Sequence, residues 1–169
     1  MARVVAVVLA AGEASRFGSP KQRLLLPGVL ERVRQSSVDE IVVVAGAYEL
    51  DPGDEVLLVR CREWRAGPGA SLRCGVAALG EDVEAVVVVL ADGPDLSPAA
   101  VDRTVGEWRR TGGVVAASYD GARGHPLVLG RADWKDIPDE GLRDRPVRLV
   151  PCDDLGWPGD VDTPDNLAP

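Results

Sequence analysis

The feature that most constrains the fold is a series of short valine-rich runs separated by amphipathic segments. Residues 4–11, 41–45 and 85–90 are wholly apolar, and short apolar runs rich in β-branched residues are typical of strands buried on both faces. Such strands form parallel sheets that are covered by helices on each side. The pattern predicts an α/β fold with a mostly parallel sheet, and residues 1–169 suffice for a single domain of this kind.

The same patterns place the remaining elements. Ser97 and Pro98 are typical of a helix start, and Val101, Val105 and Trp108 follow at the spacing of one helical face. Further strands are expected at 55–59, 114–118, 127–129 and 148–150, and further helices at 29–36 and 70–79.

Charge and hydropathy narrow the class of partner. The chain has 19 basic and 27 acidic residues, a net charge of -8, with no basic run. This disfavours binding to nucleic acid or to an anionic membrane surface. No stretch is long enough to cross a bilayer, and the valine content and early charges of the N-terminal run suit a strand better than a secretion signal.

The cysteines bear on the redox compartment. Cys61, Cys74 and Cys152 are odd in number and show no CxxC spacing, which argues against both a disulfide framework and a zinc site. A reducing cytoplasm is the expected location.

A loop after the first strand carries the strongest functional signal. Residues 9–21 read LAAGEASRFGSPK, a glycine-containing loop whose backbone N–H groups can bind phosphate oxygens while Arg16 and Lys21 neutralise them. The sequence therefore predicts a nucleoside triphosphate site and nucleotidyl transfer. Ligands of doubly wound sheets bind beyond the carboxyl ends of the strands, so this loop and residues 91–97 are expected to line one crevice.

Two acidic segments contain candidate metal ligands. Asp92 directly follows the strand at 85–90, where a carboxylate suits Mg²⁺, although strand ends often carry a turn aspartate. Near the C-terminus, Asp160 and Asp162 share a face if the chain is extended, and either could supply a second carboxylate. A helix-capping role explains Asp165 better.

Three further residues are candidates for substrate contact. His125, the single histidine, is expected in a loop between Gly124 and Pro126, where it could orient a substrate. Ser71 could cap the helix at 70–79, and Arg73 could reach an anion, although an exposed arginine is usually only solvated.

Taken in order, the segments LAAGEASRFGSPK, WRAGPGASLRCG, LADGP, GHP, DEGLR and DVDTPDNL resemble the nucleotidyltransferases of the molybdenum cofactor family, and molybdenum cofactor cytidylyltransferases in particular. The resemblance extends from Val4 to Leu167. It implies a three-layer, Rossmann-like, doubly wound fold of the nucleoside-diphospho-sugar transferase type. It also implies Mg²⁺-dependent transfer of a nucleoside monophosphate from CTP or GTP to a phosphorylated acceptor, molybdopterin or molybdenum cofactor, with release of pyrophosphate. A molybdoenzyme is among the partners it suggests.

The resemblance also implies residue roles. Catalytic roles fall on Arg16, Lys21 and Asp92, metal binding on Asp92 and Asp162 with Asp160 as a neighbouring candidate, and acceptor contacts on Ser71, Arg73 and His125. Because a phosphate acceptor is already ionised, no general base is required, which weakens a catalytic role for His125. The nucleotide-binding loop falls on Leu9, Ala10, Ala11, Gly12, Ser15, Arg16, Gly18 and Lys21.

Some positions bear on specificity. Related guanylyltransferases have a second glycine where this chain has Ala11, which favours CTP over GTP by roughly 1 to 3 kcal/mol of steric fit. The stretch LPGVL at 26–30 is shorter than in the family and predicts a trimmed helix, Gly93 replaces a larger residue, and the segment after DEGLR is abbreviated. We expect these differences from the family to alter the site that binds the acceptor.

Two alternatives keep the nucleotide site. One has a sugar phosphate or phospholactate as acceptor, and the other is an accessory protein that binds nucleotide or cofactor without turnover. A nicotinamide-dependent dehydrogenase is disfavoured because no GxGxxG follows the first strand.

Overall fold

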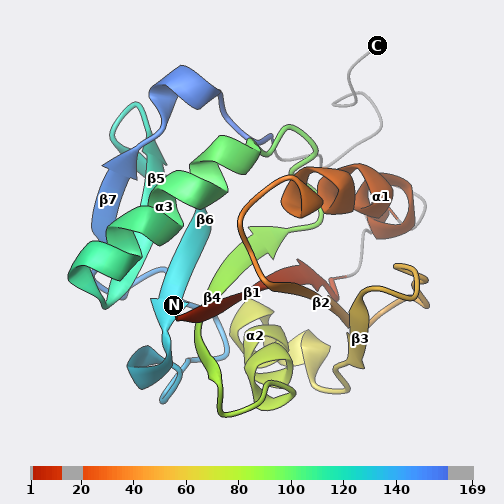
Figure 1. Cartoon of the computed structure of the whole chain (residues 1–169). Helices are drawn as coiled ribbons and strands as arrows, with labels where there is room; N and C mark the ends of the chain where they lie inside the picture. Colours follow the sequence, from red (N-terminus) through yellow and green to blue (C-terminus); the bar gives the residue numbers. More distant parts are fainter. Residues whose placement is uncertain (1, 13–20, 160–169) are drawn as a thin grey trace.

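The computed structural model describes residues 2–12 and 21–159. A seven-stranded sheet runs through it in the order β3-β2-β1-β4-β6-β5-β7 (Figure 1). Among these strands β6 alone runs antiparallel to its neighbours, which confirms the predicted mostly parallel sheet. The strands are β1 Arg3–Ala10, β2 Glu40–Ala45, β3 Leu57–Arg60, β4 Val83–Leu90, β5 Val114–Tyr119, β6 Ala122–Gly130 and β7 Arg148–Pro151.

Helices cover both faces of the sheet, so the fold has three layers. Alternate β1 residues point to opposite faces: Val4 and Val8 pack in the cluster with α1 and α3, whereas Val5 and Val7 pack in the cluster with α2. Figure 1 shows α1 and α3 on one side of the sheet and α2 on the other. The helices are α1 Lys21–Arg34, α2 Pro68–Ala77 and α3 Pro98–Thr111, with short 3-10 turns η1 Trp64–Ala66, η2 Arg131–Asp133 and η3 Asp153–Leu155. No helix in residues 2–12 and 21–159 is long and apolar enough to cross a membrane.

Helix α1 begins earlier than the sequence predicts. It covers 14 residues and contains Pro27, whereas the sequence pattern predicted a short helix at 29–36. Leu26, Val29, Leu30 and Val33 are buried against the sheet. Burial of this stripe outweighs the missing backbone N–H of Pro27, since tertiary packing supplies most helix stability.

Strand β6 is longer than predicted and contains His125, so the prediction of a loop at this position is wrong. The β5–β6 register shifts between the pairs Ala116–Leu127 and Ser118–Arg123. Residues 124–126 lie opposite the single residue Ala117 and form a bulge, a feature often found beside active sites. The Tyr119 hydroxyl donates to the His125 carbonyl oxygen at 2.8 Å and anchors the bulge.

The expectation of no disulfide is also wrong. Cys61, after β3, and Cys74, in α2, are joined by a disulfide with Cα atoms 5.7 Å apart. The 13-position separation is closed because the chain folds back through η1 and the first turns of α2. Cys152 is unpaired and buried in the core. The cysteines therefore do not support the prediction of a reducing compartment.

The sheet order creates a topological switch beside β1. The chain passes from β1 through α1 to β2 on one side, while β4 lies on the other. Leu9 pairs with Leu90, and the Ala91 backbone N–H donates to the Leu9 carbonyl oxygen at 3.1 Å. The loops that leave β1 and β4 are therefore adjacent, at the place where doubly wound sheets bind ligands.

Candidate functional site

Two adjoining cavities lie beyond the carboxyl ends of β1 and β4. The smaller has a volume of about 480 Å³ and the larger about 610 Å³. Leu9, Pro68 and Leu90 line both cavities, so the two spaces meet above the ends of these strands and the start of α2. A ligand in one cavity can thus reach a ligand in the other.

The smaller cavity contains a cation and a carboxylate side by side. Lys21 Nζ lies 3.2 Å from Asp92 Oδ2, and the two side chains are only 11% and 22% exposed. Lys21 is the first residue of α1, and Asp92 lies two positions beyond β4, so the switch point brings them together. An ammonium group can bind phosphate, and a carboxylate can bind a divalent cation.

Gln22 links the start of α1 to the residue Gly12, which follows β1. Its side chain is 6% exposed, and Nε2 donates to the Gly12 carbonyl oxygen at 2.8 Å. Gln22 Oε1 is buried and has no hydrogen-bond partner in the described part of the chain. Gln22 lines the smaller cavity, so a ligand in this cavity would lie close to the buried oxygen. The sequence analysis missed Gln22, although its position next to Lys21 was a usable signal.

Described residues of the predicted nucleotide loop divide between cavity and core. Leu9, Ala11 and Gly12 line the smaller cavity, whereas Ala10 packs in the core beside α1. The crevice predicted from the two strand-end loops is therefore present. Ser15, Arg16 and Gly18 lie outside the described residues.

The wall opposite Lys21 comes from η1 and the start of α2. Trp64, Gly67, Pro68 and Ser71 line the smaller cavity on this side. Helix α2 begins at Pro68 after Gly67, whose φ of 136° favours glycine. Ser71 is thus a buried residue inside the helix, and the prediction that it caps α2 is wrong because Pro68 and Gly67 already start the helix.

Arg73 lies in α2 but faces away from this wall. Its guanidinium donates to the Ile137 carbonyl oxygen at 2.6 Å and forms an ion pair with Asp139. Arg73 does not line either of the two cavities. The structure therefore places it against the segment before β7, apart from Lys21 and Asp92.

The larger cavity is mostly apolar, with an aromatic rim. Leu72, Val88 and Leu127 contribute to its lining, and Trp157 stands at its edge with 52% exposure. The Trp157 ring packs edge-to-face on Tyr119 at a centroid distance of 5.2 Å. This geometry suits a ligand with a flat apolar part.

His125 supplies a neutral polar group to the larger cavity. Burial is the main cause that lowers the pKa of His125 to about 4, and the Arg123 guanidinium acts in the same direction. The Asp92 carboxylate has the opposite, smaller effect. At neutral pH the imidazole is uncharged, so it can orient a ligand by hydrogen bonding but cannot neutralise an anion.

Two arginines line the larger cavity and differ in their contacts. Arg123 donates to the carbonyl oxygens of Leu142 and Arg145 at 2.6 and 2.8 Å, and so holds that segment in place. Arg143 is exposed, and within the described chain its guanidinium makes no hydrogen bond or ion pair. Sequence reasoning missed Arg143 as a site residue, although DEGLR contains it.

The predicted C-terminal metal ligands Asp160 and Asp162 lie outside the described residues. The described chain ends at Gly159, whose carbonyl oxygen is 3.4 Å from the position of a Cβ on Gly93. The Asp95 backbone N–H donates to the Pro158 carbonyl oxygen at 2.8 Å. The chain thus reaches the loop that carries Asp92 immediately before Asp160.

Comparisons with known proteins relate the chain to one family. A family model described as "MobA-like NTP transferase domain" matches residues 6–150. No curated protein gives a significant match.

Several solved structures are similar to the chain. Rv0371c from Mycobacterium tuberculosis is 27% identical with a TM-score of 0.80, over 98% of this chain and 95% of that one. A homologue of Rv0371c from Mycobacterium sp. strain JC1 is 26% identical with a TM-score of 0.81, over 97% and 92%. A nucleotidyl transferase from Methanothermobacter is 27% identical with a TM-score of 0.61, over 76% and 71%. A further Rv0371c structure, 26% identical with a TM-score of 0.73 over 97% and 95%, is a complex with manganese.

Proposed function

This chain belongs to the family of MobA-like NTP transferase domains, and from that premise we propose that it transfers CMP from CTP to a phosphorylated acceptor and releases pyrophosphate. GMP transfer from GTP is the less favoured reaction. The acceptor we propose is molybdopterin or molybdenum cofactor, with delivery of the product to a molybdoenzyme. The observation that carries the proposal is the Lys21–Asp92 pair in a cavity that opens onto a second, apolar cavity.

The smaller cavity is proposed to hold the nucleoside triphosphate. Lys21 binds phosphate oxygens there, and Arg16 shares this role through its place in the same loop. Gln22 Oε1 accepts a hydrogen bond from the nucleotide, which removes the cost of about 1 to 3 kcal/mol for a buried acceptor without a partner. Ala11 lines the same space, and its methyl group favours the smaller pyrimidine base.

The Asp92 carboxylate is also a suitable ligand for a divalent cation. Asp92 offers a partly exposed carboxylate on the wall of the smaller cavity, and Mg²⁺ and Mn²⁺ prefer such oxygen ligands. We assign Asp92 and Asp162 as ligands, with Asp160 as the neighbouring candidate. The manganese complex of Rv0371c supports the use of a divalent metal. When bound, the cation supplies neutralisation of phosphate charge.

The larger cavity is proposed to hold the acceptor. A flat pterin ring can pack on Trp157 and the apolar lining, His125 can hydrogen-bond to it, and Arg143 can bind an anionic group. A sugar phosphate fits less well, because sugar hydroxyls need many polar partners and the lining is mainly apolar. Ser71 lines only the smaller cavity, in the helix that the shared residue Pro68 begins, and we keep it as an acceptor contact where the two cavities meet. Arg73 is assigned to positioning the segment at 137–139.

The chain's own task in the reaction is alignment. An acceptor phosphate is already ionised, so it can attack the α-phosphorus without a protein base. The adjoining cavities hold the two substrates so that the attacking oxygen and the α-phosphorus meet above Leu9 and Leu90. Lys21 stabilises the negative charge on the departing pyrophosphate.

A substrate panel tests the proposal. Purified protein is given CTP or GTP, Mg²⁺ or Mn²⁺, and molybdopterin, molybdenum cofactor, a sugar phosphate or phospholactate, and pyrophosphate is measured. We expect release that requires the pterin acceptor and is faster with CTP. Turnover only with a sugar phosphate or phospholactate would show that the acceptor is one of these compounds and not a pterin. Tight nucleotide binding without pyrophosphate from any acceptor would favour the accessory protein.

A further inference from the structure

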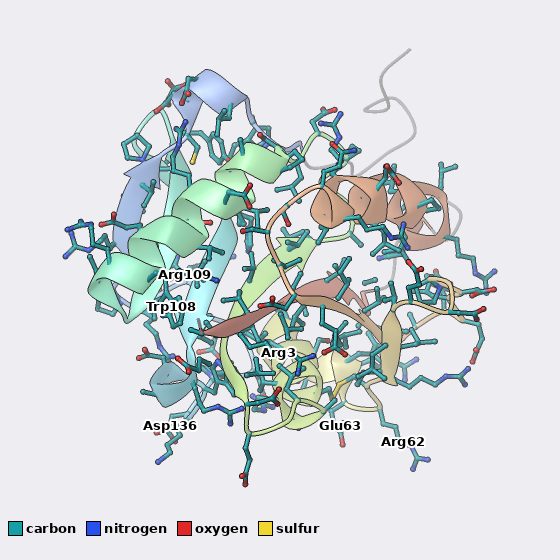
Figure 2. All side chains as sticks on the ribbon, viewed as in Figure 1. Arg3, Arg62, Glu63, Trp108, Arg109 and Asp136 are labelled. Atoms are coloured by element: carbon teal, nitrogen blue, oxygen red, sulfur yellow. A yellow bond between two sulfur atoms is a disulfide. The ribbon has the colours of Figure 1, made fainter. Side chains whose placement is uncertain are left out.

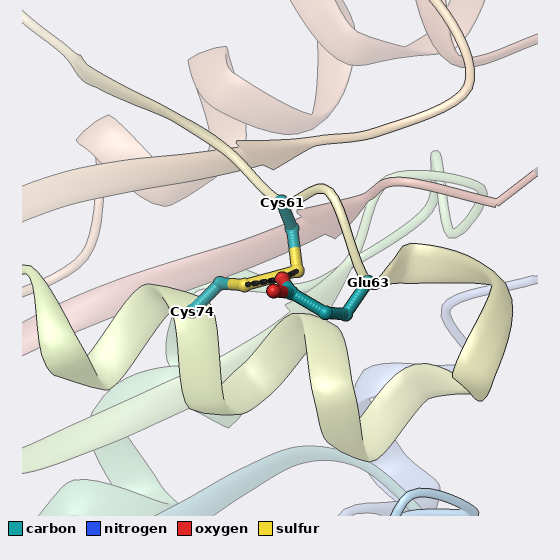
Figure 3. A group of neighbouring side chains, drawn as sticks. All are labelled: Cys61, Glu63 and Cys74. Atoms are coloured by element: carbon teal, nitrogen blue, oxygen red, sulfur yellow. Dashed lines mark hydrogen bonds between the residues drawn. A yellow bond between two sulfur atoms is a disulfide. The ribbon is translucent and has the colours of Figure 1, made fainter.

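Beyond the two cavities, two cysteines and a glutamate form a compact group. Figure 3 shows Glu63 turned toward the sulfur atoms of Cys61 and Cys74. Glu63 Oε2 lies 3.8 Å from Cys61 Sγ and 3.7 Å from Cys74 Sγ, and the three ligand atoms lie within 4.8 Å of one another. We call these three residues the Cys–Glu cluster.

The disulfide by itself does not account for the position of Glu63. A disulfide sulfur has no hydrogen to donate, so it gives a carboxylate no hydrogen bond. Within the described residues Glu63 forms no ion pair, and the adjacent Arg62 side chain extends outward from the molecule (Figure 2). A carboxylate in this position would be stabilised if the cysteines were reduced, either by hydrogen bonds from the thiols or by a cation bound between the sulfurs and the carboxylate.

We propose that the reduced Cys–Glu cluster is a binding site for Zn²⁺ or a similar thiophilic divalent cation. Cys61 and Cys74 supply two thiolates and Glu63 supplies an oxygen, which leaves a fourth position for water. In a tetrahedral zinc site the edges between sulfur and oxygen ligands are about 3.5 Å and those between two sulfurs about 3.8 Å. The observed distances from Glu63 Oε2 to the sulfurs already approach these edges.

The backbone around the cluster is held in place. The Cys61 backbone N–H donates to the Ala45 carbonyl oxygen at 2.8 Å, which ties Cys61 to the end of β2. Cys74 lies within α2, and the next residue, Gly75, packs closely on Val7 and Val44 of the sheet. Cys61 is buried and Glu63 is exposed, so a metal can enter from the Glu63 side.

The disulfide and the metal are alternative states of the same residues. A dithiol reductant exchanges with the Cys61–Cys74 bond, leaves two protein thiols and departs as its own disulfide. Binding of Zn²⁺ then displaces the two thiol protons. A low-molecular-weight disulfide reverses the process, because it accepts two electrons from the two thiolates, is released as two thiols and frees the metal.

This site differs in chemistry from the one proposed at Asp92. Thiolate ligands select zinc-like metals, whereas carboxylate and phosphate oxygens select Mg²⁺ or Mn²⁺. The inference does not depend on nucleotidyl transfer, and its test needs no substrate.

The test is a cobalt and zinc titration of the whole chain. The protein is reduced with a dithiol, freed of metal and excess reductant without oxygen, and titrated with Co²⁺ and then Zn²⁺. We expect one equivalent of Co²⁺ per chain with thiolate-to-cobalt charge-transfer absorption, and its displacement by Zn²⁺. The oxidised protein should show no such absorption. Glu63→Gln should weaken metal binding by at least about tenfold, because even the loss of a residue that only hydrogen-bonds to a metal ligand has an effect of this size.

Matched cysteine variants complete the test. Cys74→Ser, chosen because Cys74 is less buried than Cys61, should lose the charge-transfer signal, whereas Cys152→Ser should keep it. Circular dichroism verifies that both variants are folded. The proposal is overturned if the reduced chain binds no Co²⁺, if binding persists in Cys74→Ser, or if Glu63→Gln binds as tightly as the original.

Discussion

Lys21 Nζ and Asp92 Oδ2 lie 3.2 Å apart although the residues are 71 positions apart in the chain. The contact exists because α1 starts, and β4 ends, at the same edge of the sheet. It brings an ammonium group and a carboxylate, which we propose bind phosphate and metal, to one cavity. Their neighbour is a second, largely apolar cavity with room for another substrate.

Ala11 is expected to influence the choice of nucleotide. Ala11→Gly removes a methyl group from the lining of the smaller cavity and makes room for a purine base. We expect kcat/KM for GTP relative to CTP to rise by roughly 5- to 150-fold, the equivalent of about 1 to 3 kcal/mol. Competition between the two nucleotides in one reaction measures the ratio directly. An unchanged ratio would assign base selection to other residues.

Arg143 is expected to act on the acceptor alone. Arg143→Ala removes a cation that lines the larger cavity, so the KM for the acceptor should rise by roughly 10- to 100-fold while the KM for nucleotide stays constant. Arg34→Ala, at the far end of α1, is the matched control. Equal effects of both substitutions would show that Arg143 has no specific role.

His125 is expected to make stability depend on pH. Its pKa is about 4 in the folded chain against 6.5 ordinarily, so between these values the unfolded state binds more protons. Stability should therefore fall as the pH drops from 6.5 toward 4. Urea unfolding at about pH 7.5 and about pH 5 measures this, and His125→Asn should show a smaller loss. The same loss in both proteins would mean that the pKa of His125 is not lowered in the folded chain.

Gly46 is expected to control the position of Trp64. A Cβ on Gly46 would lie 2.6 Å from Trp64 Cγ and 2.8 Å from the Ala11 carbonyl oxygen, so Gly46→Ala must displace one of them. We expect a loss of about 1 to 3 kcal/mol in unfolding free energy and weaker nucleotide binding. Gly28→Ala, in α1 with no atom within 4 Å of the new Cβ, should instead stabilise by about 0.5 to 1 kcal/mol. Urea unfolding and calorimetry compare the two variants.

Local patterns in the sequence were enough to predict the mostly parallel sheet and to single out Lys21 and Asp92 as candidate site residues. Valine-rich runs predicted the central strands, and the ends of two such runs led to Lys21 and Asp92. The Cys61–Cys74 bond was not predictable in this way, because it depends on how η1 and α2 fold back. The exposure of Arg143 and Trp157 at the larger cavity, and the inward bulge at His125, likewise arise from packing between distant segments.

Helix α1 and Arg73 illustrate the same limit at single positions. The predicted helix begins only at residue 29, yet α1 begins at Lys21 and continues through Pro27 because its leucine and valine stripe is buried. Arginine often binds anions, which made Arg73 a candidate for substrate contact. Its guanidinium instead binds the segment at 137–139. In both cases a tertiary contact decides the outcome.

We propose that Lys21 and Asp92 act together in nucleotidyl transfer, and CTP-dependent pyrophosphate release in matched variants measures this. Lys21→Gln and Asp92→Asn should each lower kcat/KM by roughly 100-fold or more, the scale of losing one preorganised charged contact. Lys135→Gln and Asp54→Asn, which change exposed residues outside both cavities, should keep the original rate. Undiminished pyrophosphate release in Lys21→Gln and Asp92→Asn would show that these two residues do not take part in nucleotidyl transfer.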